Sequence, residues 1–318
     1  MCSPGKKTTL LLMVGASCIG LLAIVVIYFL MRSPASGAQP PEVPTRMNIQ
    51  QQRKVDKPVT KDQFVSVMTF NLHLLRERNV WGSESPAQAL AQPSTTDRLI
   101  GEIMSYYNGR GPDYLLLQEV PNPADSRVTN DHTYFMKALG KHYKEVRCAT
   151  ASALHCLCIA GKRKGSLVNV KHHMVTQNRA LISAEILIGG PSDGRSVTLM
   201  STHISPRDRA ALAKLLKSNY NDLGRPVILG GDFNMDMRPG LSETHLEAVV
   251  VAGSATYPGT MSTDGSLSPS TAKPVDFLMW SQGARELLSL DGALGVGSKL
   301  ISDHVPVVAI FKRQRSTL

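Results

Sequence analysis

Short runs of hydrophobic residues, some alternating with polar ones, recur along the chain from residue 64 onward. Alternation with a period of two is typical of a half-buried strand, and a short apolar run bounded by turn residues is typical of a buried strand. On this basis the predicted strands are Phe64–Phe70, Tyr114–Leu117, Val168–Val170, Ala180–Ile188, Ser196–Ser201, Val227–Leu229, Val275–Trp280 and Val305–Phe311.

Two further segments have the spacing of amphipathic helices. The first contains Leu99 and Ile103, with Ser94 or Thr96 as its N-cap, and the second is Ala210–Leu216. Many strands, few helices and polar residues that collect where the strands end indicate an α/β sandwich, with two sheets at its centre and helices outside.

The start of the chain has a different pattern. Residues 8–31 contain no charged residue and are rich in Leu, Ile and Val. As a helix they would be about 36 Å long, enough to cross a membrane, so we expect a short tail at residues 1–7 and a transmembrane anchor at residues 8–31. A cleaved secretory signal is the alternative, with Ser36 and Ala38 as the cleavage site, but the apolar run exceeds the roughly 7 to 15 residues of a signal core.

Residues 32–61 hold five prolines among polar and basic residues and have almost no periodicity. This composition predicts a linker, followed by a folded domain at residues 62–318. Basic residues flank the apolar segment on both sides, so charge hardly discriminates its orientation. Since a short amino-terminal tail usually stays in the cytosol, we expect a single-pass membrane protein with an extracytoplasmic or lumenal domain.

The net charge of +10 favours anionic partners. Half of it lies in the first 60 residues, and the remainder gives the folded domain a positive balance that suits nucleic acid or an acidic lipid surface without choosing between them. The densest basic run, Lys162–Lys164 between two glycines, is interpreted as a solvated turn.

Three of the five cysteines lie in the folded part, at positions 148, 156 and 158. In an oxidising compartment Cys148 could pair with Cys156 or Cys158, which leaves one thiol. His155 beside them raises the alternative of a metal site, but a second Cys/His pair is missing. Three buried small hydrophobic side chains are therefore the favoured interpretation.

The segment Val227–Asp236 places polar residues directly after an apolar run and two glycines. In an extended chain Asp232 and Asn234 would point into one pocket while Phe233 turns to the core, and the glycines would let backbone and ligand come close. The alternative is an Asx-rich turn after a strand.

Similar polar residues stand at the ends of the other predicted strands. The set is Asn71, Glu119, His203, Asp232, Asn234, Asp276, Asp303 and His304. A single polar residue at such a place is usually a cap or a turn residue. If these residues meet, however, their carboxylates repel one another, and a divalent cation with oxygen ligands relieves the repulsion.

Five motifs, in order and approximate spacing, resemble those of the endonuclease/exonuclease/phosphatase superfamily, which includes deoxyribonuclease I, the toxin subunit CdtB, abasic-site endonucleases, neutral sphingomyelinases and inositol-polyphosphate 5-phosphatases. The motifs are Thr69-Phe70-Asn71-Leu72, Gln118-Glu119-Val120, Gly231-Asp232-Phe233-Asn234, Val275-Asp276-Phe277 and Ser302-Asp303-His304-Val305-Pro306-Val307. The resemblance covers about residues 64–312. It implies a four-layered α/β sandwich of two packed mixed sheets with outer helices.

Carried over position by position, the resemblance implies a metal-dependent phosphodiester hydrolase. Glu119, with Asn71 and Asp303, is expected to bind Mg²⁺, for which Mn²⁺ can substitute. The phosphate is expected to be held by Asp232, Asn234 and Arg179. These roles supply the charge neutralisation that hydrolysis of a phosphodiester requires.

Proton transfer is expected to involve two histidines. The resemblance implies that His304, oriented by Asp276, takes a proton from the attacking water, and that His203 donates one to the leaving oxygen. An acidic partner for His203 is not identified, and the segment Ser152–Gly165 departs from the family pattern. Three other histidines, at positions 73, 172 and 173, are interpreted as surface or loop residues.

The residues around His203 favour one branch of the superfamily, although a histidine in a similar motif also occurs in sphingomyelinases. Thr202-His203, followed by Pro206 and Asp208, and Asn178-Arg179 before it, are most similar to deoxyribonuclease I and CdtB. The predicted function is therefore a membrane-anchored nuclease acting on DNA or RNA. The alternatives are a sphingomyelinase or another phospholipid or phosphoinositide hydrolase at the membrane surface, and a non-catalytic scaffold of the same fold.

Overall fold

The computed structural model describes most of the predicted folded domain. The described residues are 63–72, 93–126, 128–188, 194–220, 225–238, 244–249, 260–261, 267–268, 273–295 and 304–314. The chain divides into two units, Met1–Met47 and Asn48–Leu318, and the described residues all belong to the second unit.

The predicted anchor at residues 8–31 and the linker at residues 32–61 lie outside the described residues and stay predictions. Within the ranges that are described, no helix is both long and apolar enough to cross a membrane.

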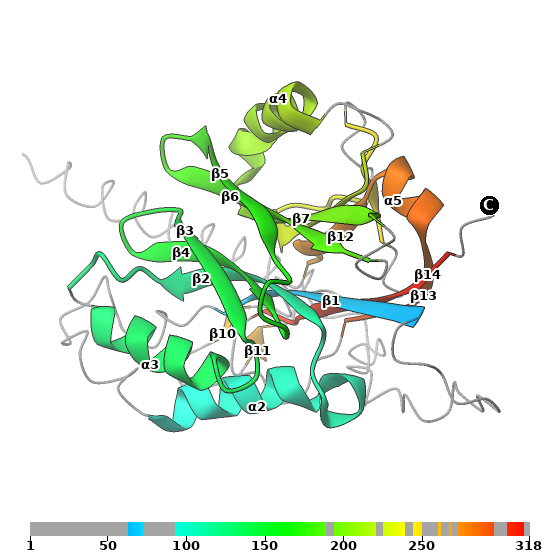
Figure 1. Ribbon diagram of the computed structural model, residues 1–318. Coiled ribbons are helices and arrows are strands. Elements are labelled where there is room, and N and C mark those ends of the chain that lie inside the picture. The colour runs from blue at the N-terminus through cyan, green and yellow to red at the C-terminus, as the bar shows by residue number, and fades with distance from the viewer. Residues whose placement is uncertain are drawn as a thin grey trace, which may run out of the picture. The chain divides into compact units, whose positions relative to one another are not determined.

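Two six-stranded sheets form the centre of the described domain (Figure 1). In spatial order the first sheet contains β13 (Leu288–Gly295), β14 (Val307–Arg313), β1 (Phe64–Asn71), β2 (Tyr114–Pro121), β4 (His155–Gly161) and β3 (Glu145–Thr150). The second contains β5 (Val168–Thr176), β6 (Arg179–Leu187), β7 (Ser196–His203), β8 (Val227–Asp232), β12 (Asp276–Trp280) and β9 (Glu247–Ala248). A separate short ribbon pairs β10 (Thr260–Met261) with β11 (Leu267–Ser268).

Each large sheet is mixed, as predicted. In the first sheet β1 and β2 run parallel and the other pairs are antiparallel. In the second sheet β7 and β8 are the parallel pair. At or near the carboxyl ends of the two parallel pairs stand four of the polar residues singled out in the sequence, Asn71, Glu119, His203 and Asp232, and the sheet order places those ends at the middle of each sheet.

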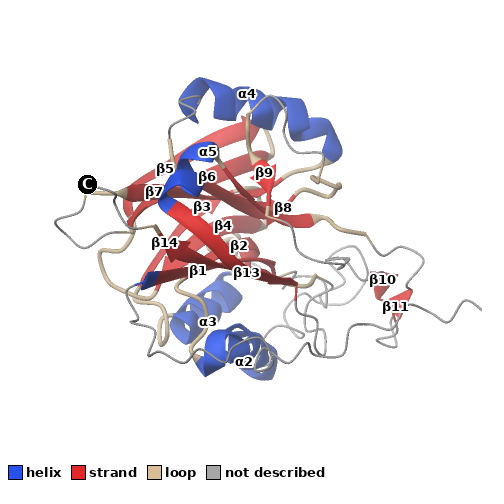
Figure 2. Cartoon of the chain, turned by 90° about the vertical axis from the view of Figure 1, so that its right-hand side faces the viewer, coloured by secondary structure: helices blue, strands red, loops and turns tan. Residues whose placement is uncertain are grey.

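Helices cover the outer face of each sheet, which gives four layers (Figure 2). The helices α2 (Pro93–Gly109) and α3 (Thr129–Leu139) pack on the first sheet, and α4 (Arg209–Tyr220) packs on the second. A short helix, α5 (Gln282–Leu287), precedes β13. The predicted N-cap of the first helix is wrong, because α2 already begins at Pro93 and positions 94 and 96 lie inside it; proline is well suited to a first helical position.

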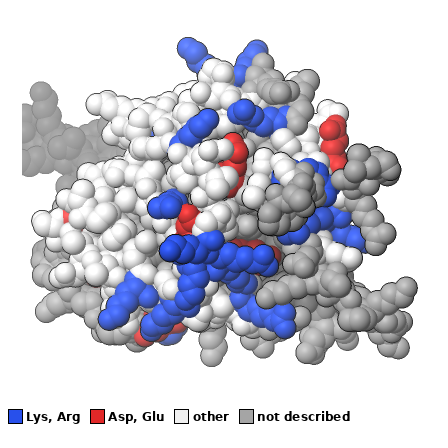
Figure 3. Space-filling view, in the orientation of Figure 1, with Lys and Arg blue, Asp and Glu red and all other residues white. Residues whose placement is uncertain are grey.

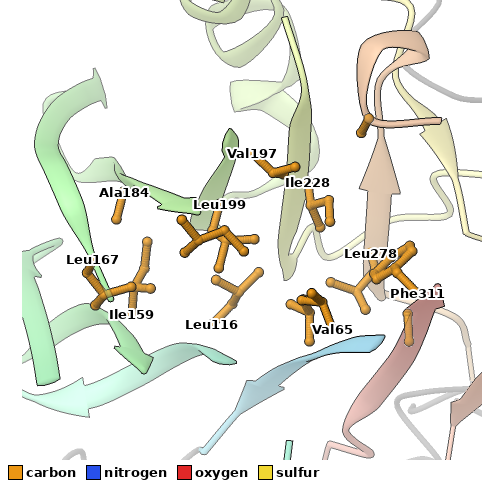
Figure 4. Close-up of a cluster of buried hydrophobic side chains, with 14 of the residues drawn as sticks. Val65, Leu116, Ile159, Leu167, Ala184, Val197, Leu199, Ile228, Leu278 and Phe311 are labelled. Carbon is orange, nitrogen blue, oxygen red and sulfur yellow. The ribbon is translucent and has the colours of Figure 1, made fainter. Parts of the chain in front are cut away.

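The largest hydrophobic cluster fills the space between the two sheets. Its members include Val65, Leu116 and Ile159 from the first sheet and Leu199, Ile228 and Leu278 from the second, all buried. Figure 4 shows these side chains pointing toward one another across the interface. This interface holds the sheets face to face, so strand ends from both sheets meet at the same edge of the sandwich.

The glycine pair before Asp232 allows close packing of protein atoms. A Cβ at Gly231 would lie 2.2 Å from the carbonyl oxygen of Thr202, and one at Gly230 would lie 2.6 Å from the Leu116 side chain. The expectation that these glycines admit a ligand is therefore wrong, because β7 and the facing sheet already occupy that space.

The pair β3 and β4 was not predicted, and it contains the cysteines. Cys148 lies directly opposite Cys158 in this antiparallel pair and forms a disulfide with it. Cys156 is a buried free thiol. The interpretation of three buried hydrophobic cysteines is wrong for Cys148, which is exposed and bonded.

Candidate active site

The register of the strands brings predicted polar residues from both sheets to one edge of the sandwich. Asp232, the last residue of β8, lies opposite His203 on the parallel strand β7 and opposite Asp276 on the antiparallel strand β12. In the first sheet Asn71, at the end of β1, lies opposite Gln118 on β2. Side chains far apart in the sequence therefore share one site.

Asn71 connects the two sheets at this site. Its amide Nδ2 donates to Glu119 Oε1 at 3.2 Å and to Asp232 Oδ2 at 3.0 Å. A second link lies behind it, where Gln118 Nε2 donates to the buried Ser201 Oγ at 2.9 Å. Since buried polar groups are costly unless they are hydrogen-bonded, these contacts fix the relative position of the sheets at the site.

Glu119 reaches the site through an irregularity in β2. The register between β2 and β4 shifts between Leu117 and Val120, and Glu119 adopts a left-handed conformation with φ of 54°. For a residue other than glycine this conformation is uncommon and is often found at functional sites. The irregularity turns Gln118 toward the facing sheet and leaves Glu119 half-buried beside Asn71.

His304 and Asp276 form a buried pair. The ring nitrogen Nδ1 of His304 lies 2.8 Å from Asp276 Oδ2. A carboxylate accepts a hydrogen bond and does not donate one, so Nδ1 carries the proton and Nε2 presents a lone pair. That Nε2 lies 3.7 Å from Asp232 Oδ2, on the side of the site. The pair thus has the geometry of a base held in one tautomer.

Asp232 and Asn234 both belong to the site, but not through an extended chain. The strand β8 ends at Asp232, and Asn234 adopts a left-handed conformation with φ of 53°. The backbone N–H of Asn234 donates to Asp232 Oδ1 at 2.8 Å, which is an Asx-type turn. The alternative interpretation of a turn is therefore correct for the backbone, while Phe233 is fully buried as predicted.

His203 is held in a defined tautomer as well. The amide Nδ2 of Asn234 lies 3.2 Å from His203 Nε2 and 3.1 Å from the carbonyl oxygen of Ile204. Because that carbonyl accepts a hydrogen bond, the amide orientation is fixed, and Nε2 is the acceptor of the second amide hydrogen. The proton of His203 is then on Nδ1, which faces Glu119 Oε1 at 3.7 Å.

Burial lowers the pKa of His203 to about 4, although the Glu119 carboxylate acts in the opposite direction. His203 is therefore neutral near pH 7 in this state. The sequence left it without an acidic partner, and the fold places two carboxylates beside it, Glu119 at 3.7 Å from Nδ1 and Asp232 at 3.5 Å from Nε2. To act as an acid, His203 must first take up a proton. This requires additional negative charge at the site, which raises the pKa of the ring.

The acidic residues of the site fit a divalent cation. Burial and the neighbouring Asp276 raise the pKa of Asp232. Single ligand atoms of Asp232, Asp276 and His304 lie within 4.8 Å of one another, and Glu119 lies on the other side of Asn71. Oxygen ligands are those that Mg²⁺ and Mn²⁺ prefer, and a cation would relieve the repulsion between the carboxylates.

The remaining predicted residues differ in how the structure places them. Arg179, the first residue of β6, lies near enough to His203 for its charge to lower the pKa of that residue. Asp303 lies outside the described residues. His172 is exposed, as predicted, and His173 is half-buried against the hydroxyl of Tyr220. Position 73 also lies outside the described ranges.

The basic run Lys162–Lys164 is not part of the site. The strand β4 begins at His155, near Glu119, and ends at Gly161, so the run follows the opposite end of that strand. Six steps along a strand span about 20 Å. Arg163 and Lys164 are exposed, in agreement with a solvated turn.

His155 lies at the site, although the sequence did not assign it a role there. Its Nε2 is 3.9 Å from Glu119 Oε2. The cause is topology: β4 is antiparallel to β2, with His155 opposite Pro121, so β4 begins where β2 ends. Recognition of a strand in Ser152–Gly165 would have located His155 at the same edge.

Comparison with known proteins supports the motif assignments. A sequence model described as "Endonuclease/Exonuclease/phosphatase family" matches residues 68–304, which is more than half of the chain. No curated protein sequence shows significant similarity to it.

Solved structures with a similar fold include three of different kinds. An endonuclease/exonuclease/phosphatase from Bacteroides vulgatus is 16% identical with a TM-score of 0.58, and the match covers 79% of this chain and 99% of that one. The human Nocturnin catalytic domain with bound sulfate is 20% identical with a TM-score of 0.54, over 79% and 95% of the two chains. D. rerio TDP2 complexed with single-strand DNA product is 16% identical with a TM-score of 0.57, over 78% and 99%. At these identities the likeness establishes the fold alone.

Proposed function

The chain belongs to the endonuclease/exonuclease/phosphatase family, whose members are hydrolases of phosphodiester bonds, and on this premise we propose that it is a divalent-metal-dependent phosphodiesterase acting on nucleic acid. The observation that carries the proposal is the buried pair of His304 and Asp276, which faces Asp232 at the edge where both sheets meet. The match to the family model and the resemblance in the motifs indicate the same family.

His304 is proposed as the general base. Its Nδ1 proton is held by Asp276, so the lone pair of Nε2 can accept a proton from a water molecule. The buried carboxylate also stabilises the imidazolium that forms, because opposite charges attract strongly where little water is present.

His203 is proposed as the group that protonates the leaving oxygen. It is neutral before substrate binds, since burial lowers its pKa. A bound phosphodiester adds negative charge next to the ring, which raises that pKa and favours uptake of a proton. Glu119, 3.7 Å from Nδ1, is placed to hold the resulting imidazolium.

Glu119, Asn71 and Asp303 are proposed to hold the cation, and Asn234, Asp232 and Arg179 to position the phosphate. Asn71 donates through Nδ2 to two carboxylates, so its amide oxygen is the atom suited to a cation. When bound, a divalent cation neutralises charge that develops on the phosphoryl oxygens.

Nucleic acid is preferred to a lipid headgroup as the substrate. Lys and Arg side chains gather near the middle of the face shown in Figure 3, and half of the chain's net charge of +10 belongs to the residues after position 60. Such a surface attracts a polyanion. D. rerio TDP2, which has a similar fold, is known in complex with single-strand DNA product, and we extend that substrate class to this chain. The motifs around His203, which are most similar to deoxyribonuclease I and CdtB, favour the same class.

The test is hydrolysis by the purified full-length chain in detergent. Plasmid DNA, single-strand DNA, RNA and sphingomyelin are each incubated with Mg²⁺, with Mn²⁺ or with EDTA, and His304→Ala serves as the inactive variant. We expect nucleic acid to be cleaved only with metal and at least about a hundredfold more slowly by the variant. Turnover of sphingomyelin without cleavage of nucleic acid would identify a lipid hydrolase, and no turnover of any substrate would favour a scaffold.

We further propose that the domain is anchored by residues 8–31 and lies in an oxidising compartment. The disulfide between Cys148 and Cys158 supports the second part, because structural disulfides are rare in the cytosol. Mass spectrometry of the chain from its native membrane, with thiols alkylated before and after reduction, tests it. Full alkylation of Cys148 before reduction would place the domain in a reducing space.

A further inference from the structure

A buried carboxylate next to the active site has no role in the mechanism above. Asp208 ends the short 3-10 helix η3 (Pro206–Asp208), which follows β7 and His203. It is only 8% exposed. An acidic residue is seldom so buried unless it has partners, so its surroundings indicate what it does.

The position of Asp208 is fixed by its own loop. The backbone N–H of Ser205 donates to Asp208 Oδ2 at 3.0 Å, and the Ser205 hydroxyl donates to the same oxygen. Burial by itself would raise the pKa of Asp208, but these hydrogen bonds and the charges of Arg179 and Arg207 lower it. Asp208 is therefore ionised near pH 7 and held in place.

Arg179 is the cation that faces this carboxylate at the site. Its Nε lies 3.7 Å from Asp208 Oδ2. Its backbone lies opposite Thr176 in the pairing of β6 with β5, and the carbonyl oxygen of the next residue, Ala180, accepts from Thr202 Oγ1 at 3.0 Å. The backbone does not determine the direction of the long Arg179 side chain.

A guanidinium group is planar and has five N–H donors. With Nε turned to Asp208, the donors on the two Nη nitrogens are left for the bidentate contact that Arg makes with phosphate. We propose that Asp208 is a positioning residue that orients Arg179 toward the substrate phosphate, and this inference rests on the proposed phosphodiesterase function.

A purely structural role for Asp208 is the competing explanation, because its carboxylate also accepts from the backbone at the start of η3. The variant Asp208→Asn separates the two. Its amide oxygen can still accept from Ser205, while the negative charge facing Arg179 is lost. If Asp208 acts through Arg179, the substitution matters only when Arg179 is present.

The experiment is a double-mutant cycle on the full-length chain with D208N, Arg179→Ala and the double variant. Two readouts are used, kcat and KM for DNA cleavage and the Kd of inorganic phosphate by calorimetry. In the wild-type background we expect D208N to lower kcat/KM by about 10-fold to 100-fold, as small misplacements of catalytic groups do, and to weaken phosphate binding. In the R179A background we expect less than about a twofold further change in either readout.

The matched control is Glu247→Gln, which removes the carboxylate of an exposed ion pair with Arg285 on β9 and α5, and it should behave as wild type. Equal effects of D208N in both backgrounds, or no effect in the wild type, would overturn the inference. The His304→Ala variant run beside them tests the function separately: cleavage that needs His304 but not Asp208 refutes only the positioning role. If no substrate is cleaved, the phosphate Kd values still decide whether Asp208 acts through Arg179.

Discussion

At the scale of single residues, the proposed chemistry depends on which ring nitrogen of His304 carries a proton. Replacing Asp276 by Asn puts an amide donor or a weaker acceptor next to Nδ1, at the place where the present contact is 2.8 Å. We expect the proton to move to Nε2, which can then no longer act as a base, and kcat to fall at least about a hundredfold. Initial rates of DNA cleavage measure this effect.

The control for this substitution is Asp236→Asn, which removes a carboxylate that pairs with Arg238 on the surface. Both variants should keep the wild-type circular dichroism spectrum. Unchanged turnover in D276N would mean that another group fixes the tautomer of His304.

His203 predicts a dependence of stability on pH. Its pKa is about 4 in the folded metal-free protein, whereas the unfolded chain keeps the ordinary histidine value of 6.5. As the pH falls from 6.5 toward 4, His203 takes up a proton in the unfolded chain but stays neutral in the folded one. The free energy of unfolding therefore falls by up to about 3 kcal/mol. Above pH 6.5 the residue is neutral in both states and contributes no pH dependence.

The measurement is urea unfolding in EDTA at several pH values, for the wild type and for His203→Gln. The variant should lose less stability on acidification over this range. His172→Ala, which removes an exposed histidine, should follow the wild type. Parallel curves for wild type and H203Q would show that burial does not depress the pKa of His203.

At the scale of elements, the disulfide joins β3, the edge strand of the first sheet, to β4. A cross-link that closes a short loop removes conformations from the unfolded chain and typically stabilises by about 2 to 3 kcal/mol. We expect reductant to lower the thermal midpoint of the wild type. Cys148→Ser should start at this lower midpoint and show no response to reductant, and a wild type that also shows none would contradict the cross-link.

The sequence allowed prediction of those strands whose side chains are apolar in a regular pattern. β1, β7, β8 and β12 are of this kind because they lie in the middle of a sheet and are covered on both faces. β3 was missed because it is an edge strand with a partly exposed, mixed pattern. β4 was missed because its cysteines do not form a pattern that predicts a strand. The location of His155 at the site was missed for the same reason.

The sequence indicated where the described residues of the candidate site stand along the chain, but not their contacts. Glu119 comes to the site through a shift in register, and Asn234 through a left-handed turn. Both depend on backbone conformations that a side-chain pattern does not encode. Asp208 and Arg179 lie on different elements, so their contact is evident only in the folded structure.

At the scale of the whole domain, the candidate site is the place where charged side chains from the two sheets meet. Glu119 comes from the first sheet and Asp232 and Asp276 from the second, joined through the amide of Asn71. Carboxylates gathered at one site repel one another, so a cation bound there would stabilise the packing of one sheet on the other. A ligand that binds only the folded state adds about 2.7 kcal/mol at one hundred times its dissociation constant.

We therefore expect the thermal midpoint to rise with Mg²⁺ or Mn²⁺ relative to EDTA. Glu119→Gln should abolish most of this rise, since it removes the carboxylate that the first sheet contributes. Glu247→Gln, far from the site, should keep the rise in full. If E119Q responds to metal as the wild type does, the cation is held by the second sheet alone and does not join the two.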